Sequence, residues 1–121
     1  MKVLLVDDDD DVRMLGQLSL RRRKWQVWAV ADGREALEVA LRELPDAILL
    51  DVQMPGWGGP ETLAALREEP RTAAIPVVFL TAEAELEDVL RYRQLGARGV
   101  ICKPFPPLEL PDLLLQALVD E

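Results

Sequence analysis

Apolar residues in this chain form two alternating patterns: short unbroken runs, and longer stretches in which apolar positions recur at helical spacing. A short unbroken run is typical of a strand that is buried on both faces, as in a parallel sheet. The longer stretches indicate helices that cover such a sheet. We therefore expect strands at Lys2–Val6, Trp25–Ala31, Ala47–Asp51, Val77–Leu80 and Val100–Cys102.

Helices are expected between these strands and after the last one. The first begins within the aspartate run Asp7–Asp11 and closes with the basic run Arg21–Lys24, since apolar residues between the two runs recur at helical spacing. Those residues are Val12, Leu15 and Leu18 or Ser19. The other predicted helices are Arg34–Glu43, Pro60–Glu68, Glu83–Leu95 and about Pro107–Val119. Pro111 fits the last helix only if it falls in the first turn, where backbone amides have no partner anyway.

This alternation of strands and helices is that of the α/β class. Short strand–helix–strand units require parallel strands, right-handed crossovers and helices on both faces of the sheet. We expect a doubly wound, flavodoxin-like sheet of five parallel strands in the order 2-1-3-4-5. The length of 121 residues, without internal repeats or linkers, predicts a single domain over residues 1–121.

Polar residues stand where the predicted strands end. Asp7 and Asp8 follow the first strand, Asp51 ends the third, and Thr81 and Lys103 follow the fourth and fifth. In the expected order the first and third strands are neighbours, and ligands of open α/β sheets bind outside the carboxyl ends. Each residue alone can be explained as a helix cap or a surface charge. Their joint occurrence at one edge of the sheet predicts a functional site.

The charge of the chain supports a local site. The net charge is −8, and five of the acidic residues form the single run Asp7–Asp11. Helix capping explains two or three of these aspartates, but not all five. An acidic chain does not favour direct binding of nucleic acid. We interpret the basic run Arg21–Lys24 as a solvated last helical turn, with a docking patch as the less favoured alternative.

Several functional classes are excluded or disfavoured by composition. The chain has no histidine and one cysteine, Cys102, so histidine catalysis and an internal disulfide are excluded and zinc sites are disfavoured. No apolar run reaches the roughly 18 residues that span a bilayer, and charges from Asp7 onward argue against a secretion signal. A single cysteine also fits a reducing compartment. We expect a cytoplasmic protein without membrane contact.

The charges at the sheet edge suggest their own chemistry. Two carboxylates about 4 Å apart repel by about 4 kcal/mol at an effective dielectric constant of 20. A hard divalent cation relieves this repulsion, and oxygen ligands select Mg²⁺, Mn²⁺ or Ca²⁺. A lysine and a metal on either side of a carboxylate would hold a phosphoryl group during transfer. Asp51, between them, would be the nucleophile, since aspartate can form an aspartyl-phosphate.

Four motifs in order carry a family resemblance. They are VDDD at Val6–Asp9, LLDVQMPGWGG at Leu49–Gly59, FLTA at Phe79–Ala82 and ICKPF at Ile101–Phe105. With these motifs the chain resembles the receiver domains of two-component response regulators, including stand-alone chemotaxis-type receivers, from Lys2 to about Val119. The resemblance implies a cytoplasmic phosphorelay in which a sensor histidine kinase or a phosphotransfer protein is the donor. It implies an output partner, unknown here, that contacts the fourth helix, fifth strand and fifth helix.

The resemblance also assigns roles to the residues of the motifs. It implies that Asp51 is the phosphoacceptor. Asp8 and Asp51 would bind Mg²⁺, or Mn²⁺ in its place, directly, and Asp7 would bind it mainly through water. The backbone carbonyl of Gln53 would complete the protein ligands of the metal.

The remaining implied roles concern the phosphoryl group. Thr81 and the backbone N–H of Ala82 would bind phosphoryl oxygens, and Lys103 would pair with these oxygens. The resemblance also implies that the Lys103–Pro104 peptide bond is cis. Such a chain is not an enzyme for a separate substrate: it would catalyse only its own phosphorylation and dephosphorylation on Asp51.

The chain departs from the family pattern at three positions. Val100 replaces the aromatic residue that often rotates inward on activation, Lys24 replaces the usual glycine after the first helix, and Pro111 is uncommon in the last helix. Without the aromatic residue, we expect Thr81 and the loop through Glu83 and Glu85 to carry the activating change.

Three alternatives compete with the phosphoacceptor. A nucleotide or flavin binder of this fold would need a glycine-rich or hydroxyl-rich first loop, whereas Asp7–Asp11 would repel phosphates. A phosphatase of the haloacid-dehalogenase type would place a second aspartate where this chain has Gln53. A pseudo-receiver that acts only as a protein-interaction module, without phosphorylation, is expected to lack Asp51, Lys103 or the acidic pair, and this chain keeps them all.

Overall fold

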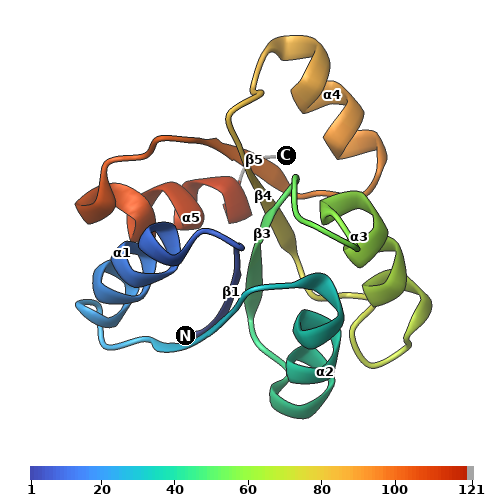
Figure 1. The fold of residues 1–121 in the computed structure, drawn as a ribbon, viewed down its shortest axis with the longest axis horizontal. Coiled ribbons are helices and arrows are strands. Elements are labelled where there is room, and N and C mark those ends of the chain that lie inside the picture. Colours follow the sequence, from blue (N-terminus) through green and yellow to red (C-terminus); the bar gives the residue numbers. More distant parts are fainter. Residues whose placement is uncertain (120–121) are drawn as a thin grey trace.

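A five-stranded parallel sheet forms the centre of the computed structural model, which describes residues 1–119 (Figure 1). The strands lie in the order β2-β1-β3-β4-β5, which confirms the predicted doubly wound, flavodoxin-like topology. Their bounds are β1 Lys2–Val6, β2 Gln26–Val30, β3 Ala47–Asp51, β4 Val77–Thr81 and β5 Gly99–Cys102. Each strand therefore lies where the apolar runs predicted it.

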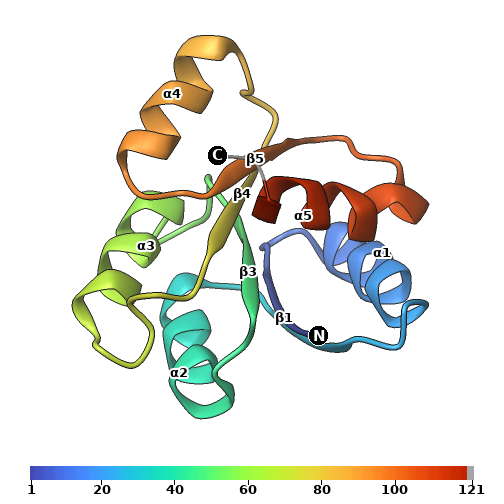
Figure 2. The same ribbon diagram turned by 180° about the vertical axis from the view of Figure 1, so that it is seen from behind.

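Helices cover both faces of the sheet, as Figures 1 and 2 show from opposite sides. On one face α1 and α5 pack together, and on the other α2, α3 and α4 follow one another along the sheet. Their bounds are α1 Asp10–Arg21, α2 Gly33–Glu43, α3 Gly59–Glu68, α4 Leu86–Gln94 and α5 Leu110–Val119. Within residues 1–119, none of the helices combines the length and the apolar character that crossing a bilayer would require.

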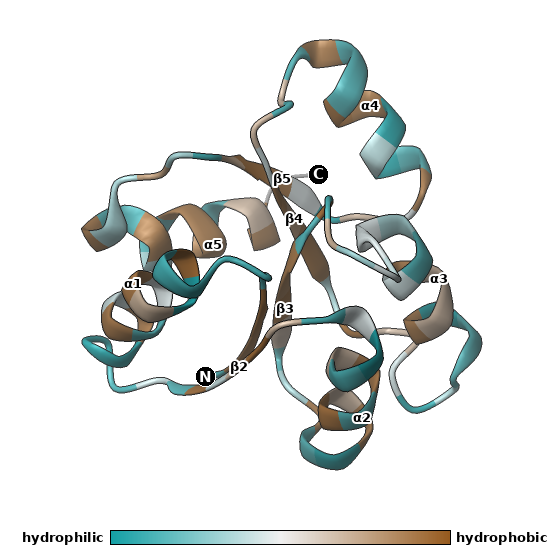
Figure 3. Cartoon of the chain, viewed as in Figure 1, coloured by the Kyte–Doolittle hydropathy of each residue, from teal (hydrophilic) through white to brown (hydrophobic). Residues whose placement is uncertain are grey.

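Two hydrophobic cores lie on the two faces of the sheet, because successive side chains of a strand point to opposite faces. Leu4, Ile48 and Leu50 belong to the core beneath α2, α3 and α4. Leu5 and Leu49 belong to the core beneath α1 and α5. In Figure 3 the central strands are accordingly the most continuous hydrophobic segments of the fold.

Helix starts explain part of the aspartate run. Asp9 is the N-cap of α1, and its carboxylate accepts the amide N–H groups of Asp11 at 2.8 Å and Val12 at 3.2 Å. Asp32 caps α2 in the same way, accepting the Glu35 amide at 2.9 Å. Asp7 and Asp8 precede the cap, so they are not needed to start α1.

The residues of α1 that face the sheet are not all those that the apolar spacing indicated. Gly16, Ser19 and Leu20 are buried, whereas Leu15 and Leu18 are exposed. A Cβ atom on Gly16 would lie 2.7 Å from Leu5 Cδ2, so glycine allows α1 to approach β1 closely at this point. The tight approach, rather than hydrophobicity, decides which residues face the sheet.

Two predicted helix starts were wrong by a few residues. The helix predicted from Glu83 begins at Leu86, because the Glu83 amide N–H donates to Thr81 Oγ1 at 3.0 Å and holds an extended turn before the helix. The helix predicted from about Pro107 begins as the 3₁₀ helix η1 at Pro107–Glu109, followed by α5. Pro111 lies in the first turn of α5, as expected.

Lys24 has a backbone conformation that favours glycine. Its φ is +64°, in the left-handed region, between the end of α1 and the start of β2. A side chain in this region costs roughly 1–2 kcal/mol relative to the right-handed conformation. The lysine that stands in place of the usual glycine after α1 therefore raises the energy of the folded backbone at this position.

Candidate functional site

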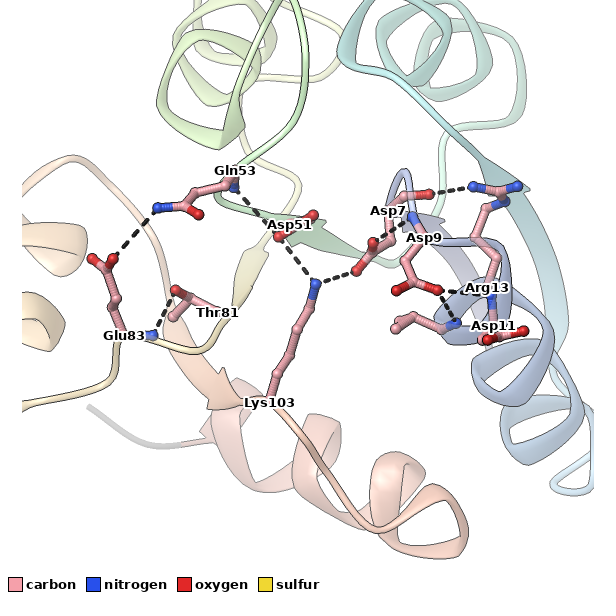
Figure 4. Close-up of polar contacts among 10 residues, drawn as sticks. Asp7, Asp9, Asp11, Arg13, Asp51, Gln53, Thr81, Glu83 and Lys103 are labelled. Carbon is pink, nitrogen blue, oxygen red and sulfur yellow. Dashed lines mark hydrogen bonds and ion pairs between the residues drawn. The ribbon is translucent and has the colours of Figure 1, made fainter.

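The carboxyl ends of β1, β3 and β5 bring Asp7, Asp51 and Lys103 together (Figure 4). Val6 pairs with Leu50 in the sheet, so the residues that follow them, Asp7 and Asp51, lie side by side at the edge. Lys103 Nζ lies 2.6 Å from Asp7 Oδ2 and 3.2 Å from Asp51 Oδ1. One ammonium group thus bridges two carboxylates.

Asp7 is fully buried and held by the start of α1. Its Oδ1 accepts the Asp9 amide N–H at 2.9 Å, and its carbonyl oxygen accepts Arg13 Nη1 at 2.7 Å. Its Oδ2 is buried and lies 2.6 Å from the Lys103 ammonium, which is its cationic partner. A buried carboxylate oxygen needs such a partner, and the Asp7 carboxylate has one in Lys103.

The Asp51 carboxyl has a raised pKa. Burial, with only 5% of the residue exposed, raises the pKa of Asp51 from 3.8 to about 6, and the neighbouring charge of Asp7 adds to the rise. Lys103 and the amide N–H of Gln53, which donates to Asp51 Oδ1 at 3.3 Å, oppose it. Burial therefore exceeds the compensation that one lysine provides.

Lys103 also has a raised pKa, but its ion-pair partners are the cause and burial opposes it. Burial disfavours its charged form, but hydrogen bonding and charge attraction from Asp7, and then from Asp51, outweigh burial and raise the pKa of Lys103. The lysine therefore stays protonated at neutral pH. The Lys103–Pro104 peptide bond that follows is cis, as the family resemblance implied.

A group of three carboxylates offers ligands for a metal ion. One oxygen from each of Asp7, Asp8 and Asp51 lies within 4.8 Å of the other two, with Asp8 exposed and the others buried. An all-oxygen group of this charge suits Mg²⁺ or Mn²⁺. Gln53 lies on the same loop as Asp51. The backbone amide N–H of Gln53 donates to Asp51. The role of the Gln53 carbonyl as a metal ligand stays a prediction.

Thr81 lies on the other side of Lys103 from Asp7 (Figure 4), and Ala82 follows it in the chain. Thr81 is buried at the end of β4, and Ala82 is exposed immediately after it. The Thr81 hydroxyl oxygen accepts the Glu83 amide N–H, and the Glu83 carboxylate accepts Gln53 Nε2 at 3.4 Å. These contacts join the loops after β3 and β4. Binding of phosphoryl oxygens by Thr81 and Ala82 stays a prediction.

Two supporting residues were not identified from the sequence. Arg13 reaches back from α1 to the Asp7 carbonyl and also pairs with Asp10. Gly59, at the start of α3, lies so close to the end of β3 that a Cβ atom would be 2.9 Å from the Asp51 carbonyl oxygen. The position of Arg13 in the first turns of α1 could have indicated its contact with Asp7. The close approach of Gly59 to β3 depends on tertiary packing, which the sequence pattern does not indicate.

A flavodoxin-like sheet with an acidic group and a lysine at its carboxyl ends defines a class of phosphorelay signalling domain. Comparison with known sequences identifies the family: residues 3–115 match the response regulator receiver domain. The chain belongs to this family and acts in two-component phosphorelay signalling.

Relatives and solved structures agree with this assignment. The chain is 38% identical over 109 residues to the alkaline phosphatase synthesis transcriptional regulatory protein PhoP of Bacillus subtilis, covering 90% of this chain and 45% of PhoP. It is similar to the chemotaxis response regulator CheY4 of Vibrio cholerae, with a TM-score of 0.90, 36% identity and coverage of 97% and 98% of the two chains. The chain thus spans less than half the length of PhoP but nearly all of CheY4.

A third similar structure contains a metal. It is the receiver domain of the sensor histidine kinase PA1611 from Pseudomonas aeruginosa, described with a magnesium ion coordinated in its active site cleft. The TM-score is 0.85, with 30% identity and 98% coverage of both chains.

The raised pKa of Asp51 predicts a pH-dependent stability. In the absence of divalent cations, the folded state keeps the Asp51 proton up to about pH 6, whereas the unfolded state loses it near pH 4. The stabilisation is therefore complete below about pH 4 and lost as the pH rises through 6. Asp51→Asn should gain stability relative to the wild type across this window, by on the order of 2 kcal/mol.

Urea unfolding of both proteins in chelator at several pH values measures this difference in the free energy of unfolding. A difference that stays constant between pH 4 and 7 would contradict the assigned environment of Asp51.

Proposed function

We propose that Asp51 accepts a phosphoryl group, in a Mg²⁺-dependent reaction, from a phosphohistidine of a sensor histidine kinase or phosphotransfer protein. One observation carries the proposal: among the described residues, Asp51 belongs to a cluster of three carboxylates and also lies 3.2 Å from the Lys103 ammonium. Its carboxylate therefore has both a positive charge and possible metal ligands beside it. The family assignment supports the same reaction.

Asp7, Asp8 and Asp51, with the Gln53 carbonyl, would hold Mg²⁺, or Mn²⁺ in its place. Asp8 and Asp51 would be direct ligands, and Asp7 would act mainly through water. When bound, the metal supplies positive charge that offsets the charge of the phosphoryl oxygens. The magnesium reported in the PA1611 receiver supports this choice of cation.

The transfer itself balances without an additional reactant. A carboxylate oxygen of Asp51 attacks phosphorus, the phosphorus–nitrogen bond to the donor histidine breaks, and the histidine nitrogen keeps the electron pair. The Lys103 ammonium, already directed at Asp51, pairs with a phosphoryl oxygen. The Thr81 hydroxyl and the Ala82 amide N–H donate to the others. Water later attacks phosphorus and restores Asp51, so the chain acts on itself and not on a separate substrate.

The output is proposed to change at α4, β5 and α5. The Glu83 amide is bonded to Thr81 Oγ1, so movement of Thr81 toward a phosphoryl group moves the loop that leads into α4. Within α4, Tyr92 is the buried residue, whereas Leu86 and Leu90 are exposed. A helix held by so little burial shifts readily. Val100, half-buried on β5, gives no aromatic ring to this change.

We also propose a cellular setting for the domain. We place the chain, as a single domain over residues 1–121, in the cytoplasm with a separate output partner and without membrane contact. PhoP is a transcriptional regulatory protein more than twice as long as its matched region. The absence of direct nucleic-acid contact is therefore a prediction for this domain and not for a larger protein that contains it.

Mg²⁺ is predicted to raise the thermal stability of the wild type. A ligand that binds only the folded state stabilises it by about 1.4 kcal/mol for each tenfold excess over its Kd, or a few degrees in Tm. Asp8→Asn should abolish most of the shift because it removes the negative charge of an exposed ligand. Asp11→Asn, in the same acidic run but outside the cluster, is the matched control and should keep the shift.

Melting curves in Mg²⁺ and in chelator measure this effect. An equal Mg²⁺ shift in wild type and Asp8→Asn would exclude the proposed ligands.

Phosphorylation is predicted to depend on Asp51, Lys103 and the metal. Intact mass after incubation with acetyl phosphate and Mg²⁺ should show one phosphoryl adduct, which peptide mapping places on Asp51. Asp51→Asn should lose it because an amide is a poor nucleophile. Lys103→Ala should slow labelling by roughly 10²-fold, as for loss of one transition-state donor. Chelator should stop the reaction.

An undiminished adduct in Asp51→Asn would disprove the phosphoacceptor. No adduct with any small donor or kinase would favour the pseudo-receiver, a protein-interaction module without phosphorylation.

If movement of Thr81 is passed through the Glu83 amide to α4, hydrogen exchange of the amides in that segment should change on activation. A beryllofluoride adduct should change protection in residues 82–95 of the wild type. The change should be much smaller in Thr81→Ala, which lacks the hydroxyl oxygen that accepts the Glu83 amide. Thr81→Ser keeps that oxygen and should restore the change. Exchange that alters only near Asp51 in the wild type would contradict the proposed output surface.

A further inference from the structure

A second charged surface lies at the opposite end of the strands from Asp51. Arg21, Arg22, Arg23 and Lys24 are all exposed where α1 ends and β2 begins. They are four of the 14 basic residues in a chain of net charge −8. In Figure 3 the end of α1 that leads to β2 is hydrophilic. These four adjacent residues form a dense patch of positive charge on an acidic chain.

An open hollow of about 410 Å³ lies beside this run. Arg21 and Lys24 supply charge, and Trp25 and Trp28 supply apolar surface, with Gln26 and Val27 completing the lining. Arg23 is already paired with Asp112 of α5. The hollow therefore combines cations and indole rings, which suits a chain with both acidic and apolar side chains.

The hollow adjoins a free edge of the sheet. β2 pairs with β1 alone: the Gln26 amide donates to the Met1 carbonyl at 3.0 Å, and the Val30 carbonyl accepts the Asp7 amide at 3.1 Å. In a parallel ladder alternate residues bond the same neighbour, so the backbone groups of Val27 and Ala29 point away from β1. The Val27 carbonyl accepts Arg21 Nη2 at 3.3 Å, which agrees with this direction. Such an edge can pair with an added strand.

Lys24 places a charge at a position that favours glycine. It occupies a left-handed conformation with φ +64° that glycine would adopt without strain. Exposed Leu44, after α2, has a similar φ of +48°, so the conformation alone assigns no function. At Lys24 the side chain adds positive charge beside the hollow.

We propose that this basic edge, formed by Arg21, Arg22, Lys24 and β2, binds an extended acidic peptide segment of a partner protein. The segment lies alongside β2, bonds the Val27 amide N–H and the backbone groups of Ala29, and directs carboxylates to the cations. The site is at the other end of the strands from Asp51, so the inference does not rest on the phosphorylation proposal.

Charge selects this occupant over others. A long polyanion such as nucleic acid, or an anionic membrane, would extend past the patch to the acidic remainder of the chain. A short segment would not. A second copy offers no suitable acidic segment at Asp7–Asp11, because that run is folded into the end of β1 and the start of α1.

A seven-residue peptide of alternating glutamate and valine tests the proposal. Calorimetric titration should show binding that weakens with salt, and exchange of the Val27 and Ala29 amides should slow on binding. Lys24→Gly should melt higher than the wild type yet bind the peptide about threefold weaker. Lys24→Gln should lose the same affinity without the gain in stability. The combination of Arg21→Gln, Arg22→Gln and Lys24→Gly should bind more than tenfold weaker.

Arg98→Gln is the matched control. Arg98 is exposed at the same end of the strands but next to β5, at the opposite edge of the sheet, so affinity should stay unchanged. Absence of peptide binding, or binding without slower exchange at Val27 and Ala29, would overturn the proposal. Tighter binding of a DNA duplex or of anionic vesicles at the same residues would replace it, as would self-association that Lys24→Gly removes.

Discussion

The arrangement of this site depends on one ammonium group between two buried carboxylates. Lys103 lies within ion-pair distance of both Asp7 and Asp51, which are almost completely excluded from solvent. Two buried negative charges beside one positive charge leave the site short of cations, and exposed Asp8 adds to the deficit. Burial raises the pKa of Asp51 to about 6, and the neighbouring charge of Asp7 adds to the rise. A further cation beside these carboxylates would relieve their repulsion.

The sheet topology makes this juxtaposition unavoidable. With β1 beside β3, the register that pairs Val6 with Leu50 sets Asp7 next to Asp51 whatever the surface residues are. The apolar runs predicted the strands and their alternation with helices, and the order 2-1-3-4-5 came from the common topology of doubly wound sheets. With that order, the polar residues at the strand ends were enough to predict which groups meet.

Other features depended on contacts between distant residues and could not be predicted from periodicity. Leu15 and Leu18 occupy helical positions but are exposed, since Gly16 sets how close α1 comes to β1. The start of α4 moved to Leu86 because a side-chain hydroxyl competes for the Glu83 amide. Similarly, Arg13 supports the Asp7 carbonyl through a bond that a linear pattern does not reveal. Each exception arises where a side chain bonds the backbone or a helix approaches closely.

The two ends of the sheet are specialised in opposite ways. At the carboxyl ends the unfavourable energy lies in the charges Asp7, Asp8 and Asp51. At the amino end of β2 the charges are solvated, and the unfavourable energy lies in the backbone of Lys24. In a marginally stable domain, either cost is a substantial fraction of the total free energy of unfolding. The two hydrophobic cores of the five-stranded sheet lie beneath both of its ends. Their packing offsets the unfavourable energy of the charges at one end and of the Lys24 backbone at the other.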